Sequence, residues 1–268
     1  MQNLKTEVRF ADMLLFDSHA HLDDAKFDLD LEEVVEKITS SCVKYVVDVG
    51  SNLESSKKAV ELSEKYPFLY AAVGVHPCDA EETESVIAEI EALAKGSKVV
   101  AIGESGLDYY WDDCPRDVQK ASFIKHIELA NKLNLPLIVH NRDAHGDTLE
   151  ILKEHRPKKA IIHCFSGSPE IAREMVKLGY YISFAGAVTF KNARNLPDAV
   201  KEVPLDKLLV ETDSPYLTPE PFRGKRNDPT LVSYTARKIA EILGISYEEL
   251  ANITFENAKR IYGLEDLK

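Results

Sequence analysis

Two histidines separated by one residue, His19 and His21, are the first residues of the chain that could bind a metal ion. They follow a short apolar run that begins at Met13 and has the composition of a β-strand. Side chains at positions i and i+2 of an extended segment point to the same side, so the two imidazoles can reach one cation where the strand ends. A pair of solvated loop histidines would give the same pattern, and the motif alone does not decide between the two interpretations.

Further ligand-type residues follow other strand-like runs of the sequence. They are Glu104 after 99–102, His140 after 137–139, His163 after 160–162 and Asp213 after 208–210, with His76 after 69–75. If His76 is set aside as a substrate contact, four imidazoles and two carboxylates are still too many ligands for one catalytic ion that keeps an open position. We therefore expect two divalent cations, with zinc, manganese or magnesium as candidates and with imidazole favouring the transition metals.

The six expected metal ligands divide into two groups. The first cation is assigned to His19, His21 and Asp213, the second to His140 and His163, and the bridging position to Glu104. Only a carboxylate has two oxygens to share between two ions. Two cations lower the pKa of a water molecule enough to give a nucleophile near neutral pH. Asp213 would then act as general base and later as proton donor to the leaving group.

Other polar residues near these positions have two interpretations. Asp17 shares a strand face with His19, and Glu211 shares one with Asp213, so each either supports a ligand or is simply a buried polar residue. The three remaining histidines fall on predicted helices or loops, and we expect them to be solvated; they are His126, His145 and His155.

A basic segment follows Asp213 in an otherwise acidic chain. Its polar residues of interest are Arg223, Lys225, Arg226 and Asn227. Three cations within four positions could grip a phosphate, and the asparagine could donate further hydrogen bonds. We expect these residues and His76 to contact the substrate. A solvated charged loop and a packed histidine are the alternatives.

Positioning these residues requires many short strands that end side by side. Eight apolar runs have strand character: the run from Met13 and the segments 43–49, 69–75, 99–102, 137–139, 160–162, 181–184 and 208–210. Segments of helical spacing or with helix-capping residues separate or follow them at 28–41, 53–66, 84–95, 115–133, 147–154, 169–178, 230–243, 246–250 and 255–262.

Eight β-α units in about 250 residues predict a single-domain (β/α)8 TIM barrel of the α/β class over residues 13–268. The active site of such a barrel lies at the C-terminal ends of its strands. A doubly wound open sheet is the rival, but the glycine-rich turn that this fold uses after its first strand is replaced by His19 and His21. Residues 1–12 are polar and aperiodic, and we expect them to be an N-terminal extension outside the barrel.

Composition limits the function further. The formal charge of −12 over 268 residues argues against a protein that coats duplex nucleic acid or a membrane surface, although one local basic loop could still bind one phosphate. The four cysteines form no Cys-X-X-Cys pair, which indicates reduced thiols in a cytoplasmic protein. We find no apolar run long enough to span a membrane, no signal-peptide core and no sign of an obligate protein partner.

Several segments around the candidate ligands carry a resemblance to a known family. They are Asp-Ser-His-Ala-His-Leu-Asp (17–23), Val-Gly-Val-His-Pro (73–77), Ala-Ile-Gly-Glu-Ser-Gly-Leu-Asp-Tyr-Tyr (101–110), His-Asn-Arg-Asp-Ala (140–144), His-Cys-Phe-Ser-Gly-Ser (163–168), Glu-Thr-Asp-Ser-Pro-Tyr-Leu (211–217) and Arg-Gly-Lys-Arg-Asn-Asp-Pro (223–229). From Met13 to about Tyr262 the chain resembles the TatD family of metal-dependent deoxyribonucleases. The resemblance implies a barrel of the amidohydrolase superfamily, a divalent-metal requirement and hydrolysis of DNA phosphodiesters, often from a 3′ end. The family's metal positions fall on the same six residues.

Two other functions compete with a deoxyribonuclease. A hydrolase of the same architecture could cleave a C–N, lactone or ester bond of a small molecule. No lysine stands at the end of the fourth strand, where many binuclear amidohydrolases carry a carbamylated lysine bridge, and this counts against it. A metal-binding or interaction protein without catalysis is the other alternative. If DNA is the substrate, an acidic protein with a small basic loop should take a frayed strand end or short oligonucleotide rather than a long duplex.

Overall fold

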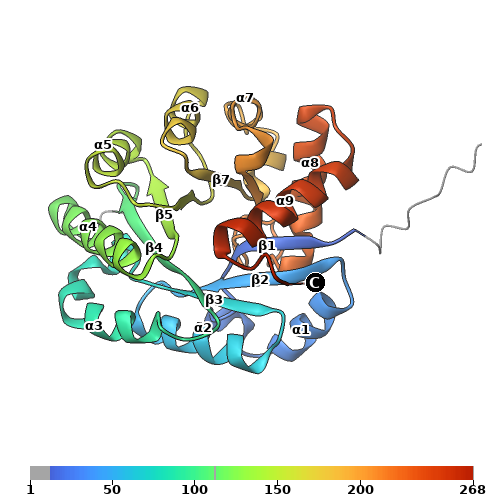
Figure 1. Cartoon of the computed structure of the whole chain (residues 1–268). Coiled ribbons are helices and arrows are strands. Elements are labelled where there is room, and N and C mark those ends of the chain that lie inside the picture. The colour runs from blue at the N-terminus through green and yellow to red at the C-terminus, as the bar shows by residue number, and fades with distance from the viewer. Residues whose placement is uncertain (1–12, 112, 268) are drawn as a thin grey trace, which may run out of the picture.

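Eight parallel strands alternate with helices around a central barrel, and the helices lie on its outside (Figure 1). The computed structural model describes residues 13–111 and 113–267, so the expected extension at 1–12 lies outside the described residues. The strands are β1 (Leu15–Ala20), β2 (Val43–Val49), β3 (Leu69–Val73), β4 (Val99–Asp108), β5 (Leu137–Arg142), β6 (Ala160–Ile162), β7 (Tyr181–Phe184) and β8 (Leu208–Val210). Their order in the sheet follows the sequence from β1 to β8.

The helices begin and end where local sequence signals allow. They are α1 (Leu31–Thr39), α2 (Leu53–Lys65), α3 (Thr83–Leu93), α4 (Arg116–Leu133), α5 (His145–His155), α6 (Pro169–Lys177), α7 (Leu196–Glu202), α8 (Val232–Leu243) and α9 (Tyr247–Tyr262), with short 3₁₀ helices η2 (Ala25–Phe27), η3 (Pro77–Glu82), η4 (Gly186–Thr189), η5 (Leu205–Lys207) and η6 (Pro229–Leu231). Asn52 caps α2 as expected, since its side chain accepts from Ser55 N while the Ser55 hydroxyl accepts from Asn52 N. Gly244 and Gly263 end α8 and α9 in left-handed conformations.

The barrel closes between its first and last strands. Ala20 forms a parallel bridge with Ser214, and Asp213 N donates to His19 O at 2.9 Å. His21 N donates to Ser214 O at 2.7 Å on the same seam. These bonds join β1 to the segment after β8, and they confirm the predicted single-domain (β/α)8 barrel.

Apolar side chains fill two layers. One cluster lies between the strands and the surrounding helices, and the other fills the barrel interior with residues such as Phe16, Val47 and Leu209. Helix α9 supplies Ile261 and Tyr262 to the interior cluster and crosses one end of the barrel (Figure 1). The Tyr262 hydroxyl donates to Ser18 O at 2.8 Å. With its N-terminal end covered by α9, the barrel presents its opposite, C-terminal mouth to ligands.

Strand β4 is longer than the sequence pattern predicts. It runs on from the expected end at 102 to Asp108, because Gly106 pairs with His140 and Asp108 with Arg142 in register with β5. Gly106 has a φ of 153°, and a Cβ atom there would collide with the carbonyl oxygen of His140. Glycine therefore lets β4 and β5 approach closely enough to pair beyond the predicted end of the strand.

Two helices also differ from the expectation. Helix α7 is absent from the predicted set because its seven residues are too few for a periodic signal. Helix α9 is continuous where the sequence suggested two pieces, and inside it the Thr254 hydroxyl donates to Leu250 O at 3.0 Å. None of the helices within the described residues is both long enough and apolar enough to cross a membrane.

His126 corrects another expectation, because it is fully buried rather than solvated. Its Nδ1 lies 2.8 Å from Ser122 O within α4, and its Nε2 accepts from Val75 N at 3.1 Å. The imidazole therefore accepts a hydrogen bond from the backbone N–H of Val75, just after β3. The sequence gave no sign that this N–H would need a side-chain partner. His145 and His155 are partly exposed.

Candidate functional site

The six predicted ligands meet at the C-terminal mouth of the barrel. They are His19 in β1, His21 just after it, Glu104 in β4, His140 in β5, His163 after β6 and Asp213 after β8. The parallel strands place their C-terminal ends on one rim, which brings together residues that are far apart in the sequence.

The first group of side chains surrounds a point between β1 and β8. The Nε2 atoms of His19 and His21 lie 3.1 Å apart, and Asp213 Oδ1 is 3.8 Å from the first and 3.5 Å from the second. Asp213 adopts a left-handed conformation with φ of 56°, which its short polar side chain tolerates. This geometry could hold one cation.

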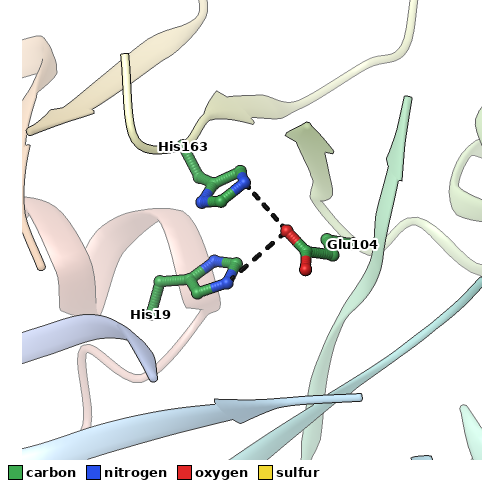
Figure 2. A group of neighbouring side chains, drawn as sticks. All are labelled: His19, Glu104 and His163. Carbon is green, nitrogen blue, oxygen red and sulfur yellow. Dashed lines mark ion pairs between the residues drawn. The ribbon is translucent and has the colours of Figure 1, made fainter. Parts of the chain in front are cut away.

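The second group lies next to the first, since the His163 ring stacks on the His19 ring with centroids 4.0 Å apart. Figure 2 shows the carboxylate of Glu104 beside the rings of His19 and His163, with one oxygen facing both. That oxygen, Oε2, lies 2.8 Å from His163 Nε2 and 3.6 Å from His19 Nε2. His140 Nδ1 is 3.6 Å from the same oxygen and 3.3 Å from His163 Nε2. The other oxygen, Oε1, lies 3.6 Å from His21 Nε2, so the carboxylate faces both groups.

The donor set fits divalent cations. His21 Nδ1 lies 2.7 Å from Val49 O, so this nitrogen carries a proton and Nε2 is left to face the other ligands. Burial alone would raise the pKa of Glu104, but the charge of His163 and hydrogen bonds from His140 and His163 hold that pKa well below its usual range. Imidazole lone pairs around an ionised, buried carboxylate suit zinc, manganese or another transition metal.

Outer contacts orient two more of the imidazoles. His140 Nε2 lies 3.0 Å from Asp108 Oδ2, and this leaves Nδ1 to face Glu104. His163 Nδ1 is 3.4 Å from Glu211 Oε1, which also accepts from Cys164 N at 2.7 Å. Glu211 is fully buried and supports His163 from behind the cluster.

Asp17 has a different role from the two histidines that follow it. Its carboxylate is fully buried and accepts from the backbone N and the hydroxyl of Thr212, at 2.8 and 2.5 Å. Burial raises the pKa of Asp17 well above its usual range, and the hydrogen bonds from Thr212 oppose that rise only in part. Asp17 therefore fixes the segment that carries Asp213 and does not face the cluster.

The cluster opens into a cavity of about 1340 Å³. Glu104, His140 and Asp213 lie in its wall, together with His76. The His76 ring packs edge-on against His140 with centroids 4.3 Å apart, and its Nδ1 accepts from Cys78 N at 3.2 Å. Burial lowers the pKa of His76 to about 3, so its ring is neutral at ordinary pH with a free Nε2–H.

The basic segment lies outside this cavity and has other partners. Arg226 forms a two-pronged ion pair with Asp30, at 2.5 and 2.8 Å, and Arg223 lies over the Phe190 ring. Asn227 is fully buried and donates to the backbone carbonyls of Thr212 and Tyr216. Neither these three residues nor Lys225 lines the cavity. In this structure the contacts of Arg223, Arg226 and Asn227 hold the segment's own fold, and the ion-pair partner of Arg226 comes from a distant part of the sequence. Substrate contact by this segment stays a prediction.

Two residues that the sequence reasoning missed lie in the cavity wall, Asp108 and Arg142. Asp108 is four residues after Glu104 on β4, and Arg142 is two residues after His140 on β5. The same even spacing on a strand that linked His19 to His21 would have found both.

A parallel barrel that gathers imidazoles and carboxylates at its C-terminal mouth defines a class of proteins, the metal-dependent hydrolases built on this fold. Comparison with known proteins places the chain within the class. The sequence model of the family described as "TatD related DNase" matches residues 16–263. The chain belongs to the TatD family, and it is a metal-dependent hydrolase.

Individual relatives are similar to this chain over nearly its whole length. The chain is 52% identical over 252 residues to YabD of Bacillus subtilis (strain 168), covering 93% of this chain and 99% of YabD. It is 41% identical over 258 residues to YcfH of Escherichia coli (strain K12), covering 94% and 97%. Both are named uncharacterized metal-dependent hydrolases. The crystal structure of YJJV, a TatD homolog from Escherichia coli K12, superposes with a TM-score of 0.87 at 30% identity, covering 93% of this chain and 98% of YJJV.

Proposed function

We propose that the protein is a deoxyribonuclease that uses two divalent cations to remove nucleotides from the 3′ ends of DNA strands. The convergence of His19, His21, Glu104, His140, His163 and Asp213 at one mouth of the barrel is the observation that supports this most strongly. The family described as "TatD related DNase" supports the choice of DNA over a small-molecule amide, lactone or ester.

The ligands divide as their distances suggest. His19, His21 and Asp213 would hold one cation, and His140 and His163 the other, with Glu104 shared between them. When bound, such cations supply Lewis acidity to a phosphoryl oxygen and lower the pKa of water. The imidazoles favour zinc or manganese over magnesium.

Asp213 is the best placed proton carrier. Its side chain is 14% exposed, against 5% for Glu104, and it lies in the cavity wall. Its carboxylate takes the proton of the attacking water as the P–O bond to the new phosphate oxygen forms. It then returns that proton to the 3′ oxygen as the bond from phosphorus to that oxygen breaks, leaving a 3′ hydroxyl and a free 5′ nucleotide.

Two neutral or cationic donors in the cavity wall can hold the phosphate. His76 presents Nε2–H beside His140, and Arg142 brings a guanidinium to the same wall. Both would hold a phosphate inside the cavity, which residues 223–227 do not line. All four cysteines are free thiols, which supports a cytoplasmic site for this reaction.

A labelled single strand tests the proposal. Purified protein, stripped of metal and reloaded with Zn²⁺, Mn²⁺ or Mg²⁺ in turn, should shorten a 5′-labelled oligonucleotide one nucleotide at a time from its 3′ end. Glu104→Ala and Asp213→Asn should leave the strand intact, whereas Asp198→Asn, a change on the outer helix α7, should behave as the wild type. An intact strand with every metal, or equal cleavage by the Glu104 and Asp213 variants, would rule out the proposed mechanism.

A panel of amides, lactones and small esters tests the alternative function, hydrolysis of a small molecule. Turnover of such a compound without cleavage of DNA would assign the site to small-molecule hydrolysis instead.

A further inference from the structure

Exposed aromatic side chains gather at the mouth of the cavity. Within the described residues the exposed aromatic side chains are Tyr110, Trp111 and Tyr216, at 55%, 51% and 44% exposed. Trp111 and Tyr216 line the cavity itself, and Trp111 is the only tryptophan of the chain. Large aromatic surfaces left in water beside a ligand cluster are typical of a binding site.

Trp111 belongs to a built arrangement and not to a loose loop. Its ring stands edge-on to Tyr110 with centroids 4.9 Å apart, and the Arg142 guanidinium lies over both rings at 4.0 Å from Tyr110 and 5.7 Å from Trp111. Asp108 Oδ1 accepts from the backbone N atoms of Tyr110 and Trp111 at 2.9 and 3.0 Å. The other oxygen of Asp108 bonds His140, so one carboxylate links the two aromatic residues to a metal ligand. We call Tyr110, Trp111 and Arg142 the aromatic platform.

The charges of the cavity indicate what the platform binds. Carboxylates such as Asp24, Asp28 and Asp113 line the cavity, and Lys58 and Arg142 are its only lysine and arginine within the described residues. Lys58 is already paired with Asp28 at 2.6 Å. Arg142 has no ion pair with any described carboxylate. Apart from the two proposed metal ions, this acidic wall offers only one available cation to a run of phosphates, so a nucleic acid gains part of its affinity here from its bases.

We propose that the aromatic platform is a stacking subsite for the terminal, unpaired base of a DNA strand, with Arg142 directed at the phosphate next to that base. This inference rests on the proposed function and narrows its substrate class to single-stranded or frayed ends. A base inside a duplex stays paired and stacked on its neighbours, so it cannot lay its face on Trp111 without being unpaired.

The single tryptophan provides the test. Zinc-loaded protein is titrated with a short single strand whose linkages are phosphorothioates to slow cleavage, with a blunt hairpin of the same linkage and with inorganic tripolyphosphate. Trp111 fluorescence should fall with the single strand, change little with the hairpin and stay unchanged with tripolyphosphate. Equal quenching by all three ligands would overturn the inference.

Variants measured by anisotropy of a labelled single strand extend the test. Trp111→Leu should weaken binding roughly 5- to 100-fold, the range expected for one lost base stack. Trp111→Phe keeps an aromatic face and should restore most of that binding. Leu205→Ala, a change of an exposed side chain just before β8 at the opposite end of the barrel, should bind as the wild type.

The two proposals fail in different ways. If Trp111→Leu binds single strands as tightly as the wild type while the wild type still shortens DNA, the stacking subsite is wrong and the nuclease stands. If no metal supports cleavage but binding depends on Trp111, the nuclease is wrong and the subsite stands. No detectable binding of any single strand overturns the subsite.

Discussion

At the scale of single residues, Asp108 is the most informative side chain of the site. One of its oxygens accepts from two successive backbone N–H groups, and the other holds His140 Nε2. Burial of Asp108 acts to raise its pKa, but the hydrogen bonds from His140, Trp111 and Tyr110 lower it below the usual value. The carboxylate therefore stays ionised and sets which nitrogen of His140 faces Glu104.

Asp108→Asn should weaken metal binding and hydrolysis by about 10- to 100-fold, the usual cost of losing the partner of a metal-ligating histidine. An amide is uncharged and accepts more weakly from the His140 ring. Zinc affinity is measured by competition with a chromophoric chelator. Asp113→Asn serves as control, because Asp113 lines the same cavity but has no ion pair with a histidine of the cluster. A change of less than twofold in Asp108→Asn would contradict the role given to this carboxylate.

The candidate ligands could be found from the sequence because each stands near the end of an apolar run. His19 and His21 needed only the two-residue repeat of a strand. Arg226 shows what such reading cannot find, since its ion pair with Asp30 exists only when the fold brings the two residues together. An ion pair across nearly two hundred positions leaves no local pattern.

At the scale of elements, His126 links α4 to the end of β3. Its two ring nitrogens bond Ser122 O and Val75 N, and burial lowers its pKa from 6.5 to about 4, with the Ser122 carbonyl opposing that shift in part. The folded protein therefore keeps this ring neutral at a pH where the unfolded chain would protonate it.

The free energy of unfolding should fall as the pH is lowered from 6.5 to 4. In that interval the unfolded state binds a proton at His126 that the folded state does not, and stability then decreases with falling pH. The loss from this one group reaches about 3 kcal/mol at pH 4. His126→Gln removes this titrating group. The difference in the free energy of unfolding between the variant and the wild type should therefore narrow from pH 7.5 to pH 4.5. Urea unfolding at several pH values measures it, and parallel pH profiles of the two proteins would refute this assignment.

Strand prediction succeeded where the runs are plainly apolar and failed where glycine intervenes. The segments 43–49, 160–162, 181–184 and 208–210 form strands with those bounds. The extension of β4 to Asp108 depends on pairing with β5, a non-local contact that glycines permit and that no periodicity reports. That extension also carries the missed Asp108.

At the scale of the whole molecule, the ligands come from β1, β4 and β5 and from the segments after β1, β6 and β8, so bound cations would join both sides of the closing seam. Metal removal should lower the stability of the entire barrel. A cation present at 100 times its dissociation constant adds about 2.7 kcal/mol. Unfolding by heat or urea is measured in chelator and after zinc is restored, with Glu104→Ala as the variant expected to respond least. Equal midpoints for the wild type with and without zinc would show that the cluster does not bind it.

The seam between β1 and β8 has a consequence for synthesis of the protein. Its bonds join His19 and His21 to Asp213 and Ser214, which are made when most of the chain already exists. During synthesis, the nascent polypeptide contains the first five ligands, His19 to His163, for some time before Asp213 is added. The set of metal ligands is therefore complete only after Asp213 has been synthesised.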